Sequence, residues 1–553
     1  ISGVNNIFLN RKLEGIKVEA DWGQSIHSDG RDAHYAGAFG TGFANDRGHV
    51  SFAAEHQSLD ALGCIEVRDW CAKNANVITN PAAGAYSATL GGWAFNGALV
   101  TASNPHPANI MAYNVRSPFT PAGVIAGPFT GPLAQVNTSG TALMPFQSGV
   151  GSTVFYPAVS GGEGRPAYYY TNLRSPVDRN VFTGTLSFKV TDTVNLTADA
   201  SWGEVTTDQR TGALDDGGFF GKGIRNDNAF LLSNPALNAQ VQPLLLNNFF
   251  SFPVQLNKDW TSQLDSHSAF NTKVRRISAG LDGRFGETSW TWDTYVQYGK
   301  SERTQLVQDN RHLNAYDFAA DAVFDNRDAA LPVNQRRIEC RITQQIRTGA
   351  ATVTSMGQNL YNIAQGCLPI NVFGTAPLDP KAKAYAFGFL HEATTVEQKV
   401  AAFNATGDLF AGFGAGAVQG ATGVEFRNEK GSNIGSQNGA PDYVRNDYLI
   451  QYGESFAGKV NVIEAYGEVS LPLLRDAPLA KRLEIDSLSA RWSQYKNTGT
   501  LGPGDGVKRT HDMFTWKASG FWDPVDGVRI RASRSRDSRA ANFRELYYGQ
   551  IIQ

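Results

Sequence analysis

Apolar and polar residues alternate with a period of two along many segments of this chain. From Ile16 to Trp22 every second residue is apolar, and the residues between them are charged. The same alternation recurs at residues 182–188, 194–202, 277–285 and 516–522. Successive side chains of a strand point to opposite faces, so this pattern predicts long amphipathic β-strands.

About thirteen such strands are predicted, and short and long connections alternate between them. A compact soluble domain rarely contains such long loops, whereas an outer-membrane barrel has short turns at one end and long loops at the other. The expected fold class is therefore all-β, a transmembrane antiparallel β-barrel with long extracellular loops. The predicted strands are 15–24, 34–43, 48–59, 179–190, 193–205, 273–285, 288–302, 396–408, 416–430, 459–471, 482–497, 510–522 and 526–536, and the long connections are 60–178, 206–272, 303–395 and 431–458.

Contact with lipid explains how so many strands keep an apolar face without a second sheet to cover it. In hydrocarbon every backbone polar group must be paired, so the sheet has to close on itself. Bacterial single-chain barrels have even strand numbers, so we expect thirteen strands to be part of a larger wall. We also expect tryptophans near strand ends to form interfacial girdles.

The segment around Ser487 breaks the alternation. Leu483 and Ile485 are in phase with each other but out of phase with Leu488 and Trp492. A single lipid-facing side therefore requires one extra residue, and we predict a β-bulge near Ser487.

Composition excludes several classes of protein. The 553 residues include 49 Lys and Arg against 51 Asp and Glu, so no excess of positive charge favours nucleic acid as a partner. We find neither a signal peptide at the start nor a run of 18 apolar residues, which excludes a helical membrane span. Cys64 with Cys71 and Cys340 with Cys367 favour two disulfides in an oxidising compartment; four unrelated buried thiols are the alternative.

Several segments resemble one family. Residues 535–546, S-R-D-S-R-A-A-N-F-R-E-L, are similar to the mid-barrel signature of TonB-dependent outer-membrane receptors, with Ala541 where proline is usual. Residues 367–374, 407–410 with 423–427, and 464–469 with 471–474 resemble the same family in the same order.

The beginning of the chain resembles this family as well. Residues 3–15 are similar to the last strand of the plug domain, which leads directly into the first barrel strand. The expected organisation is residues 1–14 as the end of the plug and residues 15–553 as the receptor barrel, with its C-terminal strands missing.

The resemblance implies a 22-stranded barrel in the outer membrane of a Gram-negative bacterium. It implies active uptake of a scarce, large solute, such as a ferric siderophore or an oligosaccharide, with energy delivered by TonB and its inner-membrane complex. Outer-membrane lipid and lipopolysaccharide would surround it. Catalytic patterns are incomplete in this sequence, so we expect no enzyme activity, no cofactor and no metal.

Candidate site residues form two sets. The alternation places one set toward the lumen or plug, where ion pairs to the plug and contacts with solute are equally good interpretations: Glu19, Asp199, Arg284, Glu464, Arg491, Lys517 and Arg531. A second set lies in the loops and could stack on or attract a substrate, although packing between loops explains the aromatics equally well: Trp70, Trp93, Tyr169, Phe219, Trp260, Arg336 and Arg337. A cation site at Asp321, Asp325 and Asp328 lacks the spacing of an EF-hand.

Two other classes of protein remain open at this stage. A passive outer-membrane porin would show the same alternation, and the complete gene would then lack a plug. A secreted soluble β-protein that binds carbohydrate would need a second sheet over its apolar strand faces. The substrate itself is not identified by the sequence.

Overall fold

A computed structural model gives the fold of the chain. It describes residues 11–64, 67–73, 76–79, 109–117, 119–127, 131–150, 159–166, 172–210, 214–216, 222–246, 254–437, 447–451, 455–501, 506–541 and 545–546. Among these residues, no helix is both long enough and apolar enough to cross a membrane.

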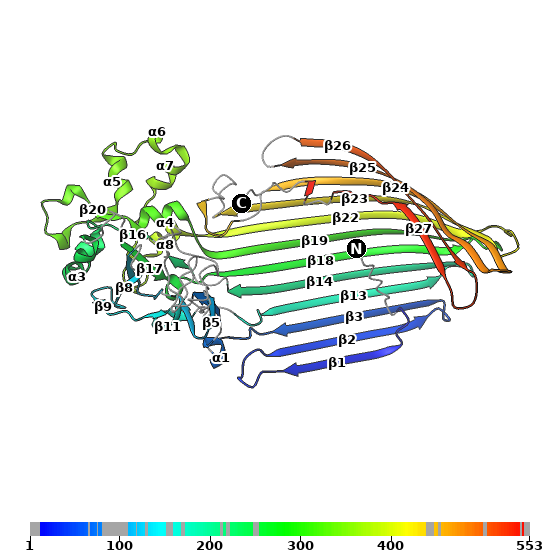
Figure 1. Ribbon diagram of the computed structural model, residues 1–553, viewed down its shortest axis with the longest axis horizontal. Coiled ribbons are helices and arrows are strands. Elements are labelled where there is room, and N and C mark those ends of the chain that lie inside the picture. The colour runs from blue at the N-terminus through cyan, green and yellow to red at the C-terminus, as the bar shows by residue number, and fades with distance from the viewer. Residues whose placement is uncertain are drawn as a thin grey trace, which may run out of the picture.

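A single antiparallel sheet of thirteen strands dominates the fold (Figure 1). Each strand pairs with its sequence neighbours, so the sheet is an up-and-down meander and its connections alternate between the two ends. In sheet order the strands are β1 (Gly15–Gly23), β2 (Asp32–Phe43), β3 (Gly48–Leu59), β13 (Val177–Lys189), β14 (Val194–Arg210), β18 (His267–Arg284), β19 (Thr291–Arg311), β22 (Phe387–Phe410), β23 (Val418–Gln437), β24 (Phe456–Ala477), β25 (Ala480–Leu501), β26 (Gly506–Asp523) and β27 (Ile530–Arg536).

These thirteen strands correspond one to one with the thirteen predicted from alternation, so the expected all-β class is confirmed. The largest differences lie at the loop ends, where β22 begins at Phe387 instead of residue 396 and β23 continues to Gln437. In the added part of β22 apolar residues such as Phe389 and Leu390 fall on both faces, and in the added part of β23 they are few, so alternation gives no signal there.

The predicted irregularity near Ser487 is also present. The register of β25 shifts against β26 between Glu484 and Ser487, and against β24 between Val469 and Leu471. The shift keeps Leu483 and Leu488 on one face although they are five positions apart, which confirms the β-bulge.

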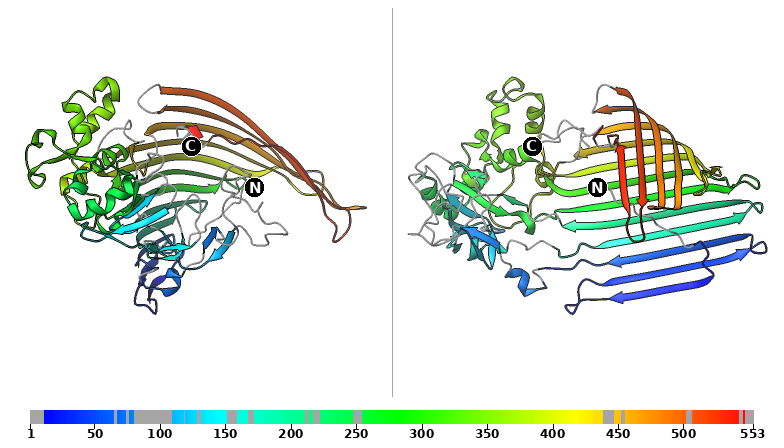
Figure 2. Two further views of the ribbon diagram at one scale, coloured as in Figure 1. Left: turned by 60° about the vertical axis from the view of Figure 1, so that its left-hand side comes forward. Right: turned by 45° about the vertical axis from the view of Figure 1, so that its right-hand side comes forward.

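The sheet curves along its length (Figure 2). On one face large apolar side chains are exposed, including Ile16 (74%), Val18 (79%) and Trp22 (65%). The opposite face holds buried polar groups such as Asp199 and Glu464. No described part of the chain covers the apolar face, as expected if lipid covers it.

The long connections gather at one end of the sheet and build a separate loop body (Figures 1 and 2). Its strands form small sheets of two to six members. They are β4 (Asn76–Thr79), β5 (Asn109–Ala112), β6 (Val115–Ser117), β7 (Val124–Gly127), β8 (Gly131–Val136), β9 (Leu143–Met144), β10 (Ser148–Val150), β11 (Val159–Gly162), β12 (Arg165–Pro166), β15 (Asp215–Asp216), β16 (Lys222–Ile224), β17 (Val254–Asp259), β20 (Ala322–Phe324) and β21 (Ile338–Cys340).

The helices also lie in this loop body. They are α1 (Asp69–Ala72), α2 (Ala229–Leu232), α3 (Pro235–Leu246), α4 (Leu313–Ala320), α5 (Arg341–Arg347), α6 (Val353–Met356), α7 (Gln358–Gln365) and α8 (Pro380–Ala386). Short 3-10 turns occupy Trp260–Ser262, Asn326–Asp328 and Val333–Gln335. Apolar residues from three long connections, among them Val136, Trp260 and Tyr316, pack into one core, so the loop body has its own hydrophobic centre.

Candidate functional site

The pairing register places all seven lumen candidates on one face of the sheet. Residues directly opposite one another in an antiparallel pair share a face, and the face alternates along each strand. Opposite pairs can be followed strand by strand from β1 to β27, and every lumen candidate is met on the same side. We call this side the polar face: it bears Glu19, Asp199, Arg284, Glu464, Arg491, Lys517 and Arg531.

A chain of side-chain hydrogen bonds crosses four strands of the polar face. Arg276 on β18 donates to Gln297 on β19 at 2.8 Å, and Gln297 donates to Gln398 on β22 at 3.2 Å. Gln398 then donates to Glu429 on β23 at 2.9 Å, and Arg427 lies 3.4 Å from the same carboxylate. Sequence analysis missed this row because its members come together only through the strand register.

Glu464 is the best-enclosed carboxylate among the predicted lumen residues. Arg491 Nη1 lies 3.1 Å from Glu464 Oε2, and the Tyr495 hydroxyl donates to Oε1 at 3.1 Å. The Arg491 guanidinium also lies 5.3 Å from the centre of the Tyr466 ring. Two of the seven candidates are thus brought into contact, and their charges are satisfied within the sheet wall.

Asp199 contacts a residue that lies 188 positions earlier in the sequence. Its Oδ2 accepts from Arg11 Nη2 at 3.0 Å and from the Ser278 hydroxyl at 3.2 Å. Arg11 precedes the first strand, so the segment before the sheet lies against the polar face. Arg284, Lys517 and Arg531 are exposed elsewhere on that face.

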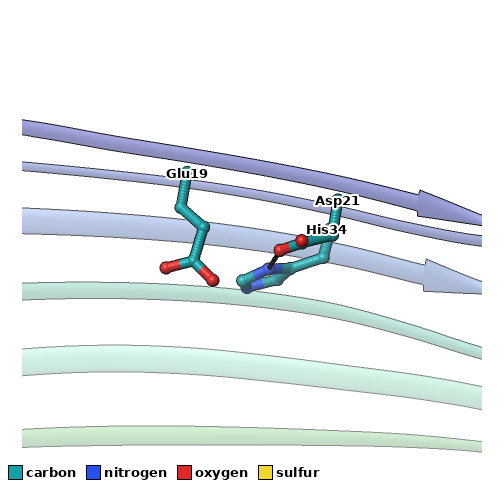
Figure 3. Close-up of side chains that lie close together, drawn as sticks. All are labelled: Glu19, Asp21 and His34. Atoms are coloured by element: carbon teal, nitrogen blue, oxygen red, sulfur yellow. Dashed lines mark hydrogen bonds and ion pairs between the residues drawn. The ribbon is translucent and has the colours of Figure 1, made fainter.

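Glu19 lies near the free edge of the sheet (Figure 3). Glu19 and Asp21 on β1 point toward the ring of His34 on β2, and these three residues offer ligand atoms within 4.8 Å of one another. His34 Nδ1 is 3.3 Å from Asp21, and Nε2 is 3.4 Å from Glu55. Such exposed acidic groups pair with histidine without requiring a metal.

The aromatic loop candidates have different environments. Trp70 is exposed on α1. Trp260 is fully buried and packs edge-on against Tyr316 and obliquely against Phe387, with ring centres 5.9 and 5.8 Å away. Trp260 therefore packs the loops against each other, which was the alternative to substrate binding. Trp93, Tyr169 and Phe219 lie outside the described residues.

Of the two arginine candidates, Arg337 makes ion pairs and Arg336 hydrogen-bonds to backbone carbonyls. Arg337 Nε donates to Asp328 at 2.9 Å, and Arg336 donates to the Leu331 and Ala329 carbonyls at 2.8 Å. Hydrogen bonds from Arg327 hold the pKa of Asp325 well below its usual range. Because these arginines already have partners within the chain, their guanidinium groups are less available to bind an anion than the sequence suggests.

The same network includes the three loop aspartates that were considered as a cation site. Asp325 contacts the guanidinium groups of Arg327, Arg337 and Arg347, and Asp328 contacts that of Arg337. Asp321 contacts Arg341 at 3.1 Å. Guanidinium groups occupy the positions that a cation would need, so this cation site is not formed.

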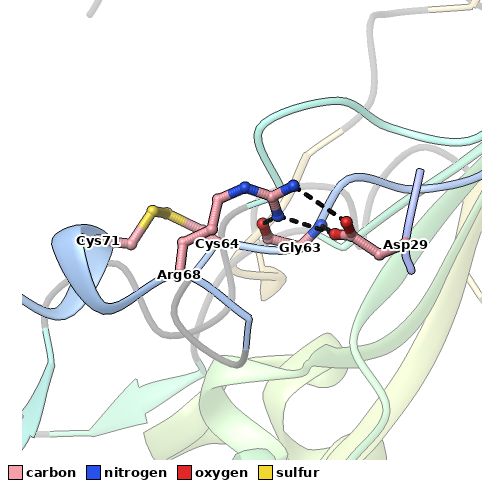
Figure 4. The surroundings of a disulfide bond; sticks show 5 residues. All are labelled: Asp29, Gly63, Cys64, Arg68 and Cys71. Carbon is pink, nitrogen blue, oxygen red and sulfur yellow. Dashed lines mark hydrogen bonds and ion pairs between the residues drawn. A yellow bond between two sulfur atoms is a disulfide. The ribbon is translucent and has the colours of Figure 1, made fainter. Parts of the chain in front are cut away.

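Both predicted disulfides are present. Cys64 pairs with Cys71 and Cys340 pairs with Cys367. Beside the first bridge, Arg68 donates to Asp29 at 2.8 and 2.9 Å, and Asp29 also accepts from the Gly63 amide at 3.0 Å (Figure 4). These hydrogen bonds, together with one from Ser25, hold the pKa of Asp29 well below its usual range.

Lys258 is a charged residue in the loop core that sequence analysis missed. Its side chain is fully buried, and Nζ donates to the carbonyls of Pro121 at 2.7 Å and Gly374 at 2.5 Å. The ammonium lies 4.6 Å from the centre of the Trp260 ring. Burial lowers its pKa to about 7, partly opposed by the charge of Asp259. Lys258 ties three long connections together.

Comparison with known family models finds a match in the C-terminal part of the chain. Residues 358–552 match the family model described as TonB dependent receptor-like, beta-barrel. The resemblance predicted from the sequence is thereby confirmed for these residues. Proteins of this family are transporters of the Gram-negative outer membrane, which confirms the expected location. No curated protein matches the sequence.

Several solved structures can be aligned with most of this chain. FpvA of P. aeruginosa bound to a heterologous pyoverdine has 9% identity and a TM-score of 0.39, covering 94% of this chain and 41% of FpvA. The ferric-catecholate import receptor Fiu from E. coli K12 has 9% identity and a TM-score of 0.27, with coverage of 94% and 65%. The siderophore receptor PiuA from Acinetobacter baumannii has 8% identity and a TM-score of 0.26, with coverage of 94% and 58%. The chain therefore spans less than half the length of FpvA.

Proposed function

We propose that this chain is the larger part of the wall of an outer-membrane active transporter that uses energy delivered by TonB. The observation that supports the proposal best is the division of the thirteen-stranded sheet into two faces, together with the family match over residues 358–552. The apolar face suits lipid, and the polar face suits the lining of an enclosed passage.

The polar face is built to be rigid. The row from Arg276 to Glu429 and the Glu464 cluster satisfy their charges by hydrogen bonds between neighbouring strands. A wall stabilised in this way can hold a movable plug without changing its own shape. Arg284, Lys517 and Arg531 remain exposed on this face and are proposed to meet the plug or the solute.

The contact between Arg11 and Asp199 supports the proposed plug boundary. Arg11 belongs to the segment assigned to the end of the plug, residues 1–14, and Asp199 belongs to the wall. Glu14 Oε1 also lies 3.0 Å from Nε2 of His49 on β3. We propose that such ion pairs seat the plug and that energy transmitted through TonB breaks some of them.

Solute capture is assigned to the loop body. Trp70 is exposed there, and an indole can stack on a sugar ring or an aromatic chelate. The solute is proposed to be scarce and large, such as a ferric siderophore or an oligosaccharide. TonB with its inner-membrane complex and the lipids of the outer membrane are the proposed partners.

Deletion of the complete gene in its host tests the proposal. We expect uptake of one ferric siderophore or oligosaccharide to disappear, to return with the intact gene, and to disappear again when TonB is removed. Uptake that survives removal of TonB would identify a passive porin instead. Uptake of the same solute by the deletion strain measures the contribution of other receptors and is subtracted.

A further inference from the structure

The β-bulge in β25 adjoins a cavity in the polar face, near the end of the sheet away from the loop body (Figure 1). Ile485 and Asp486 together oppose the single residue Gly520, so the bulge adds one residue to β25. The cavity, which we call the bulge cavity, has a volume of about 360 Å³. Bulges are frequent beside functional sites. The charged and hydroxyl side chains that line the bulge cavity are Asp486, Lys517, Ser519, Arg529, Arg531 and Ser533.

Two serine hydroxyls lie in the middle of this lining. Ser519 on β26 and Ser533 on β27 are directly opposite one another in the register. Ser519 Oγ is enclosed, and it makes no hydrogen bond within the described part of the chain. Because buried hydroxyl groups nearly always have a hydrogen-bond partner, this hydroxyl is available to a ligand in the cavity.

Two basic side chains flank the serine pair from opposite directions. Lys517 precedes Ser519 by two positions on β26, and Arg531 precedes Ser533 by two positions on β27. Because these strands are antiparallel, the two basic residues lie on either side of the serines, each roughly 7 Å away along its strand. Long, flexible side chains at these places can reach one anion above the hydroxyls. Among the described residues, neither Lys517 nor Arg531 forms an ion pair.

The charges around the bulge cavity favour a singly charged anion. Arg529 donates to both carboxylate oxygens of Asp523 at 2.7 Å, so its charge is already compensated. Asp486 contributes one negative charge against the two positive charges of Lys517 and Arg531. One carboxylate balances the remaining positive charge, whereas a doubly charged anion exceeds it. Guanidinium groups also match the two oxygens of a carboxylate in geometry.

We propose that the bulge cavity binds a single carboxylate group of a solute that moves along the polar face. Lys517 and Arg531 hold the carboxylate oxygens by charge-assisted hydrogen bonds, and Ser519 donates one more. Asp486 accepts from a hydroxyl or ammonium group beside the carboxylate, so the ligand unit is an α-hydroxy or α-amino acid. This inference rests on the proposed function and names a chemical class for its solute.

Binding of lactate to the complete protein, purified in detergent, tests this site. Lactate carries a hydroxyl beside its carboxylate, and lactamide replaces the carboxylate with a neutral amide of similar shape. Saturation-transfer NMR measures the affinity for each. The test variant is K517Q/R531Q. The matched control, K189Q/R509Q, also removes one lysine and one arginine from the polar face, but outside the bulge cavity.

We expect lactate to bind at least about 10-fold more tightly than lactamide, and K517Q/R531Q to weaken lactate binding at least about 10-fold. The control should bind lactate like the unaltered protein. Absence of saturable lactate binding, equal affinity for lactamide, or equal lactate binding by the two variants would overturn the proposal. Displacement of lactate by an equal concentration of sulfate would also overturn it, because the cavity would then select only for negative charge.

A second variant keeps every charge of the bulge cavity. Ser519→Ala removes one hydroxyl and should weaken lactate binding several-fold. Unchanged binding in Ser519→Ala would contradict the assigned hydrogen bond. Heat-modifiable mobility shows whether each variant is folded.

Uptake by cells tests whether the solute uses this site. In the deletion strain, the complete gene carrying K517Q/R531Q should restore uptake several-fold more slowly than the gene carrying K189Q/R509Q. Equal restoration would overturn the role of the cavity in transport. The lactate measurement needs neither TonB nor transport, so its failure would leave active uptake of another class of solute intact. Lactate binding together with uptake that survives removal of TonB would instead leave a carboxylate site in a passive porin.

Discussion

Arg11 Nη2 lies 3.0 Å from Asp199 Oδ2, although the two residues are 188 positions apart in sequence. The contact joins the segment before the first strand to the fifth strand of the sheet. Asp199 is nearly buried, and the Ser278 hydroxyl shares its carboxylate, so the ion pair is held in a defined geometry. It is the clearest link between the proposed plug and the wall.

Breaking this link is expected to loosen the N-terminal segment. We predict that Arg11→Gln increases proteolytic cleavage within residues 1–14 several-fold and raises the entry of large antibiotics in cells expressing the complete protein. The control is Arg31→Gln, which removes an exposed ion pair with Asp60 at 3.1 Å and is expected to change neither. Equal cleavage in both variants would contradict a seating role for Arg11.

Glu464 is expected to contribute to the stability of the wall. Glu464→Ala leaves Arg491 and Tyr495 without their shared acceptor, which should cost about 1–3 kcal/mol. Glu464→Gln keeps an acceptor and should cost less. The temperature at which the folded band disappears in heat-modifiability gels measures this order, and a Gln variant less stable than the Ala variant would contradict it.

Lys258 predicts a pH dependence of the loop body. Burial lowers the pKa of Lys258 from 10.5 to about 7 in the folded protein, so between these values the unfolded loop body holds more protons than the folded one. Stability of the loop body should therefore rise as pH increases from about 7 toward about 10. Proteolytic resistance of the loops, measured across this range, should increase in the unaltered protein.

Lys258→Met serves as the comparison for this pH dependence. Met fills similar volume without a titrating group, so the rise in resistance between about pH 7 and about pH 10 should disappear. A rise that persists in Lys258→Met would assign the dependence to another group.

The bridge between Cys340 and Cys367 is expected to stabilise only the loop body. It closes a loop of 27 residues and lies in a small core with Ile342 and Ala364. Replacing both cysteines by serine should destabilise this region by about 2–4 kcal/mol. Proteolysis near α5–α7 should accelerate, while the melting of the sheet in heat-modifiability gels stays unchanged. A lower sheet melting temperature would contradict independent loop and sheet stability.

The sheet could be predicted well from the sequence because the alternation within each strand shows which of its side chains share a face. Alternation located thirteen strands, the single break in phase located the bulge near Ser487, and local cysteine spacing gave both disulfides. The seven polar-face residues followed from the same rule. Their ion-pair partners did not, because partners such as Arg11 and Asp199 meet only through the register of the whole sheet.

The loop body could not be predicted in the same way. Its strands are short, and residues that meet in its core, such as Val136, Lys258 and Phe373, come from different long connections. Trp260 was equally consistent with binding and with packing, and only its burial beside Tyr316 decides between them. Local patterns carry no information on such contacts.

Site-directed spin labelling tests the two-faced wall most directly. All four cysteines of the chain are in disulfides, so single cysteines can be introduced at Val424 and Ile463 on the apolar face and at Glu425 and Arg427 on the polar face. In lipid bilayers, labels at 424 and 463 should be accessible to oxygen and protected from a water-soluble nickel chelate. Labels at 425 and 427 should be only weakly accessible to oxygen. Similar accessibility of neighbouring positions 424 and 425 would contradict a wall with lipid on one side and an enclosed polar interior on the other.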